Sequence, residues 1–91
     1  PFDDRDGSIW MDGKLIPWRS AQVHILTHAL HYGSSVFEGI RVYAGRAFKL
    51  REHNQRLITS GEILGMKSPF TVEQIDQACN EVIKAQGIVD G

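Results

Sequence analysis

The chain has 91 residues, 42% of them hydrophobic and 23% charged, which is the size and balance of one small globular domain. A net charge of -1, with no basic run and no long apolar run, argues against nucleic acid, an anionic membrane, a signal peptide and a transmembrane helix. Cys79 is the single cysteine, which excludes an internal disulfide and fits a reducing compartment, the cytoplasm.

A hairpin is predicted near the N-terminus. Two short apolar runs, residues 9–11 and 14–16, flank the dipeptide Asp12-Gly13. This is a strong hairpin signal, because both residues of such a turn take positive φ. Pro17 has no backbone N–H to donate, so we expect it to end the second strand or to lie at a sheet edge.

The most informative stretch is residues 28–43. Residues 28–32 show no alternation and predict a short helical turn, whereas residues 36–43 alternate with period two and predict a strand. One face of this strand would carry a ring, a bare glycine, a guanidinium and a phenol, from Phe37, Gly39, Arg41 and Tyr43.

That face is unusual for a surface that only packs. A glycine between a ring and a cation lets another group approach the backbone closely, which favours a binding face. The alternative is a strand with one solvated face and an incidental glycine. Glu38 has the opposite parity, so we expect its side chain to face away and to pair with a cation.

The C-terminal half predicts a return strand at 47–50 and two helices. Apolar side chains recur at helical spacing over residues 51–64, and Gly65 ends that helix. A capping box of Thr71 and Gln74 begins the second helix, Val72 to Gln86. The predicted fold class is α+β, with an antiparallel sheet of two hairpins and two main helices packed on one face.

Motifs for metal or nucleophile chemistry are weak. The spacing of His24, His28 and His31 would suit metal ligands on a helix, but the segment is not convincingly helical and no carboxylate or cysteine pattern joins it. We therefore expect structural histidines and no metal site. No serine-nucleophile motif and no phosphate-binding glycine loop is present, and Cys79 falls on an apolar helical stripe.

A family resemblance rests on Tyr32-Gly33 and on the run Val36-Phe37-Glu38-Gly39-Ile40-Arg41. Both resemble the N-terminal part of the branched-chain amino acid aminotransferases, which are pyridoxal 5'-phosphate enzymes of fold-type IV. The resemblance implies a full-length enzyme that moves an amino group between leucine, isoleucine or valine and 2-oxoglutarate. Alternatives are another fold-type IV enzyme, a D-amino acid aminotransferase or aminodeoxychorismate lyase, or a non-catalytic α+β binding or assembly domain.

The resemblance also implies binding roles. Arg56, in the pattern His53-Asn54-Gln55-Arg56-Leu57, would hold the cofactor phosphate, for which a planar, always-charged guanidinium is well suited. By residue type alone Arg56 is a solvated helix residue, and Arg46 and Arg51 remain open as alternatives.

The same resemblance implies a substrate pocket. Phe37 and Gly39 would line it for an aliphatic side chain, and Arg41 would make polar contacts there. Tyr32 would close the pocket from the neighbouring subunit of a homo-oligomer, a dimer or larger.

No catalytic residue is expected within the chain. A transaminase needs a lysine that binds the cofactor as a Schiff base and moves the α-proton. In the family this lysine belongs to the second domain, and none of the four lysines here has its context: Lys14, Lys49, Lys67 and Lys84. Residues 1–91 are therefore interpreted as a single N-terminal domain, a fragment that is inactive alone.

Overall fold

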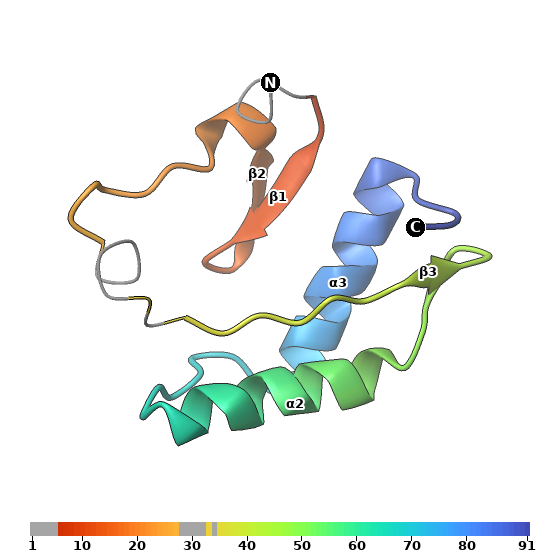
Figure 1. The fold of residues 1–91 in the computed structure, drawn as a ribbon. Coiled ribbons are helices and arrows are strands. Elements are labelled where there is room, and N and C mark those ends of the chain that lie inside the picture. The colour runs from red at the N-terminus through yellow and green to blue at the C-terminus, as the bar shows by residue number, and fades with distance from the viewer. Residues whose placement is uncertain (1–5, 28–32, 34) are drawn as a thin grey trace.

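The computed structural model describes residues 6–27, 33 and 35–91; Tyr32 and the turn predicted at 28–32 lie outside the described residues. The described elements, in chain order, are β1 (Ser8–Met11), β2 (Lys14–Pro17), the 3-10 helix η1 (Trp18–Ser20), β3 (Val42–Tyr43), β4 (Arg46–Ala47), α2 (Leu50–Ile63) and α3 (Val72–Gln86). The two helices cross, and the segment that leads to β3 passes over both (Figure 1). None of the described helices is long and apolar enough to cross a membrane.

Both predicted hairpins form. In the first, Met11 pairs with Lys14 around Asp12 and Gly13, whose φ angles are 51° and 93°. In the second, the turn residues 44–45 also have positive φ, 49° and 76°, which matches the twist of a tight two-residue hairpin. Local turn chemistry therefore decides both reversals.

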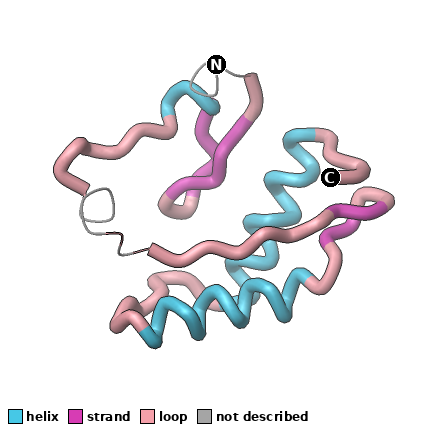
Figure 2. The backbone as a smooth tube through the Cα atoms, in the orientation of Figure 1, coloured by secondary structure: helices cyan, strands magenta, loops and turns pink. Residues whose placement is uncertain are grey.

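The predicted central strand is corrected to a short one. Only Val42–Tyr43 is paired as β3, with Arg46–Ala47, because no described residue lies along residues 35–41 as a neighbouring strand (Figure 2). The return strand is likewise not 47–50, since Lys49 takes a φ of 51° and turns the chain directly into α2. The two hairpins form two separate two-stranded sheets rather than the single sheet predicted.

The predicted alternation nevertheless persists along residues 36–43. Side chains of one parity are half-buried, ending with Val42, which is 6% exposed. Those of the other parity are exposed, and Phe37 is 89% exposed. Val36 lies against α2, and Ile40 borders an apolar groove of about 350 Å³ formed largely by α3, with further side chains from β3, β4 and Trp10 of β1. The stretch therefore has one face on the helices and one on solvent.

Both helix ends follow the predicted signals. Thr71 Oγ1 accepts a hydrogen bond from the Gln74 N–H, and Gln74 Oε1 accepts one from the Thr71 N–H, which completes the capping box. At the end of α2, Gly65 has a φ of 81°, and the Met66 N–H bonds the Gly61 carbonyl. These caps therefore fix where α2 ends and where α3 begins on either side of the turn between them.

A polar seam joins α2 to α3. Arg51 bonds Glu73 at 2.8 Å and lies 3.7 Å from Asp76. Asn54 is only 2% exposed and donates to Asp76 Oδ1 at 2.8 Å, so its buried amide has a partner. Cys79 borders the same seam, and burial raises the pKa of its thiol, which agrees with the packing role predicted for it.

The C-terminal residues pair with β3. Val42 and Gly91 exchange both backbone hydrogen bonds, at 2.6 and 2.9 Å. Arg41, the preceding residue, accepts from the Phe48 N–H on the β4 side. Because successive residues of a strand direct their backbone groups to opposite edges, Gly91 lies on the edge away from β4.

Candidate functional site

A cluster of three charged or titratable side chains joins the segment before β3 to helix α2. Arg56 donates from Nε to both carboxylate oxygens of Glu38, at 3.0 Å each, and from Nη2 to Oε1 at 2.6 Å. His53 Nδ1 lies 2.8 Å from the same Oε1. His53 and Arg56 are three residues apart on α2 and so share one face of the helix. The expectation that Glu38 pairs with a cation is confirmed.

The electrostatics of this cluster follow from its hydrogen bonds. The Arg56 bond, with a smaller effect from His53, lowers the pKa of Glu38 from 4.5 to about 2. The same bond raises the pKa of Arg56. Glu38 is therefore a carboxylate at neutral pH, and it holds a permanently charged guanidinium beside it.

The pH dependence of stability should reveal this ion pair. Because the folded-state pKa of Glu38 is depressed, its contribution is present above pH 4.5 and is lost as the pH falls to about 2. We expect the difference in unfolding free energy between the parent and Glu38→Gln to be constant above that window and to shrink within it. Urea unfolding at a series of pH values measures it; a difference that grows on acidification would contradict the pairing.

Arg56 keeps an open side. Its side chain is 63% exposed, and no described residue hydrogen-bonds its Nη1. Hollows flank the guanidinium, one bordered by Gln55 and Thr59 and the other by Lys49, and Glu52 borders both. An anion that reached this surface would therefore meet a fixed guanidinium with donors still available.

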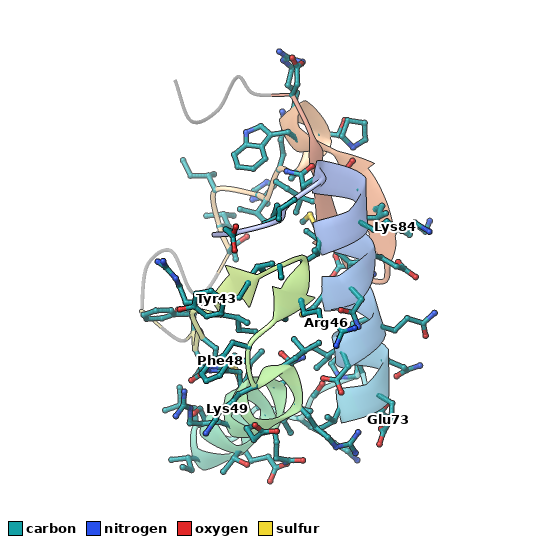
Figure 3. The ribbon with its side chains drawn as sticks, turned by 90° about the vertical axis from the view of Figure 1, so that its right-hand side faces the viewer. Tyr43, Arg46, Phe48, Lys49, Glu73 and Lys84 are labelled. Atoms are coloured by element: carbon teal, nitrogen blue, oxygen red, sulfur yellow. The ribbon has the colours of Figure 1, made fainter. Side chains whose placement is uncertain are left out.

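The two other arginines differ from Arg56. The guanidinium of Arg51 is committed to the carboxylates of α3, which also raise its pKa. Arg46 is an exposed residue of β4, and Figure 3 shows it apart from the Tyr43, Phe48 and Lys49 side chains. The structure thus separates three arginines that residue type alone leaves equivalent.

The predicted pocket residues form a second group. Phe37, Gly39 and Arg41 share the exposed face, whereas Glu38, and with it Arg56, lies on the other. A Cβ added at Gly39 would meet no described atom within 4 Å. The structure therefore brings Phe37, Gly39 and Arg41 to one side of the backbone and Arg56 to the opposite side. Tyr32 lies outside the described residues.

A cluster of two aromatic rings and one cation, Tyr43, Phe48 and Lys49, continues the exposed face; these contacts were not predicted from the sequence. Tyr43 and Phe48 meet edge to face with centroids 5.9 Å apart, and Lys49 Nζ lies 5.8 Å from the Phe48 ring (Figure 3). The signal was available, since these residues flank a short hairpin. Among the described residues, no group of three or more side chains could hold a metal ion.

Comparison with known proteins identifies the family. The family model "Amino-transferase class IV" matches residues 35–90, which include Phe37, Glu38, Gly39, Arg41 and Arg56. The chain belongs to this family.

The similar proteins have more specific names. A Rickettsia felis protein named "Probable branched-chain-amino-acid aminotransferase" is 51% identical over 82 residues, which are 90% of this chain and 28% of that protein. The Pseudomonas aeruginosa branched-chain-amino-acid aminotransferase is 44% identical over 93% of this chain and 29% of its own length. The solved Escherichia coli branched-chain amino acid aminotransferase superimposes with a TM-score of 0.89 and 38% identity, over 94% of this chain and 30% of that one. The chain thus spans less than a third of the length of these relatives.

Proposed function

We propose that the chain is the N-terminal domain of a pyridoxal 5'-phosphate-dependent branched-chain amino acid aminotransferase. The full-length enzyme would transfer an amino group between leucine, isoleucine or valine and 2-oxoglutarate. The observation that carries the proposal is the likeness, in backbone and in sequence, to solved branched-chain enzymes over 94% of the chain. One of these enzymes, 41% identical to this chain, was crystallised with N-(5'-phosphopyridoxyl)-L-glutamate and with pyridoxamine 5'-phosphate.

The residues of the chain fit one part of such a cofactor, its phosphate. Arg56 offers an oriented guanidinium with an open side, and a phosphate can take two parallel N–H bonds from it. Pyridoxal phosphate, when bound, supplies the electron sink for amino-group transfer. The contribution of this chain is to hold and orient the phosphate, with Arg56 as the cofactor-binding residue.

Substrate recognition would use the opposite side of residues 36–43. Phe37 presents an apolar ring that no other part of the described chain covers, and Gly39 leaves room beside it. We assign these two residues to the aliphatic side chain of the substrate, and Arg41 to a polar contact. Tyr32 would complete the pocket of a neighbouring subunit in a homo-oligomer.

The surface of the chain supports a larger assembly. It exposes 7102 Å², whereas a folded monomer of this length exposes roughly 5,300 Å². Val42 and Ala78 are the only buried apolar side chains among the described residues, and they keep 6% and 5% of their surface exposed. Further protein packed on this chain, from a second domain and a second subunit, would complete the core. We place the enzyme in the cytoplasm, where the free Cys79 would stay reduced.

The activity of the chain alone tests the proposal. Given pyridoxal phosphate, leucine and 2-oxoglutarate, residues 1–91 should show no amino transfer, because the lysine that the reaction needs is expected outside them. The protein expressed from the complete reading frame should catalyse the transfer. A full-length protein that binds no cofactor and transfers no amino group would favour the non-catalytic binding domain.

A further inference from the structure

We propose that Glu38 is a positioning residue that orients Arg56 for the cofactor phosphate. This inference rests on the proposed function, since it assumes that Arg56 meets a phosphate. The carboxylate is held by the segment before β3, and its side chain is 14% exposed, so it is the fixed partner of the pair. Arg56 is the long, largely solvated partner.

The contact geometry leaves the right donors available. Glu38 occupies the edge of the guanidinium that carries Nε and one N–H of Nη2. No described carboxylate forms an ion pair with the end of the group, which carries Nη1 and the second N–H of Nη2, although Glu52 borders the hollows beside it. Two parallel N–H bonds from that end are the usual way in which arginine binds a phosphate.

The contact between His53 and Glu38 keeps that end of the Arg56 guanidinium open. An ionised carboxylate can only accept, so Nδ1 of His53 carries the proton in its 2.8 Å contact with Glu38. Nδ1 therefore cannot also accept from Arg56 Nη2, although the two nitrogens are 3.1 Å apart. His53 supports Glu38 from the side and leaves the second Nη2 proton for a ligand.

Preorganisation explains why this matters for binding. A free arginine side chain loses rotamer freedom when it binds a ligand, and a partner that fixes it beforehand removes part of that loss. Glu38 also stands between Phe37 and Gly39 in the chain, so the same backbone carries the phosphate-orienting carboxylate on one face and the proposed pocket on the other. A shift of this backbone would move both.

The test compares two ligands in the full-length apoenzyme. Dissociation constants for pyridoxal 5'-phosphate and for pyridoxal, which lacks the phosphate, are measured by calorimetry for the parent, Glu38→Gln and Glu38→Asp. We expect both variants to weaken pyridoxal phosphate binding about 3- to 10-fold, the value of one well-made hydrogen bond, and to change pyridoxal binding little. Glu73→Gln, which removes the hydrogen-bonded carboxylate partner of Arg51 on the neighbouring helix and leaves Asp76, is the matched control and should change neither constant.

The outcomes separate positioning from simple charge. If Glu38 acted only by its charge, Glu38→Asp would match the parent and Glu38→Gln would bind the phosphate more tightly; either result overturns the proposal. Arg56→Ala should lose the phosphate preference, and adding Glu38→Gln to it should cause no further loss. If Arg56→Ala keeps the preference, the proposed phosphate role of Arg56 has failed as well. If Arg56→Ala loses the phosphate preference but Glu38→Gln binds pyridoxal phosphate as tightly as the parent does, only the positioning role of Glu38 is wrong.

Discussion

Replacing Arg56 by alanine in the full-length enzyme should weaken pyridoxal phosphate binding about 10- to 100-fold. A charge-assisted bidentate contact with a phosphate is worth roughly that factor in affinity. The side chain is 63% exposed and anchored at one edge, so its removal takes away a donor set without opening a buried cavity. Equilibrium titration of the apoenzyme with the cofactor measures the effect.

Arg51→Ala is the matched control for this change. It removes an arginine of similar exposure from the same helix, one whose guanidinium is bound to Glu73 and Asp76 of α3. We expect near-parental cofactor affinity for this variant, with any loss in thermal stability instead. Equal affinities for Arg56→Ala and the parent would remove Arg56 from the site.

Adding one methyl group at Gly39 should depress kcat/KM for leucine and valine by about 10- to 100-fold. A Cβ there meets no atom of the described chain within 4 Å, so the domain itself has room for it. If a branched substrate side chain occupies that space, overpacking of this kind typically costs about 1–3 kcal/mol. Alanine as a substrate reaches less far and should be affected less.

The measurement is kcat/KM for a series of substrate side chains, with thermal stability recorded in parallel. Gly45→Ala is a useful contrast, because Gly45 has a φ of +76° in a hairpin turn and its replacement strains the fold. That variant should lose stability and keep its substrate preference. Equal losses for all substrates in Gly39→Ala would show that Gly39 shapes no side-chain pocket.

Local signals in the sequence predicted the local structure well. Asp12-Gly13, the capping box at Thr71 and the glycine at position 65 each determine backbone geometry within a few residues, and each behaves as predicted. The α+β class and both helices followed from them. Solved structures of fold-type IV branched-chain enzymes share this backbone.

Contacts between residues far apart in the sequence were harder to predict. Whether residues 36–41 form a strand depends on a neighbour to which they can bond, and period two alone cannot supply one. Asn54 is another case: its type predicts exposure, whereas contact with Asp76 buries it.

The candidate site was likewise predictable only in its local features. The alternation alone predicted that Glu38 lies on the face opposite Phe37 and pairs with a cation. The structure confirms this pairing and shows that the cation is Arg56. Residue type left Arg56 and Arg51 equivalent, the family resemblance favoured Arg56, and the structure adds that the contacts of the two arginines differ. The binding roles all stay predictions, those of Arg56, Tyr32, Phe37, Gly39 and Arg41.

The two hydrogen bonds between Val42 and Gly91 also impose a register. A chain that continued past Gly91 in the same direction would run antiparallel to residues 35–41, with its first residue opposite Arg41 and its second opposite Ile40. Side chains directly opposite share a face, so the second and fourth residues would point toward the helices, beside Ile40 and Glu38. A slip of one position would exchange the two faces and bring solvent-facing side chains against the apolar groove.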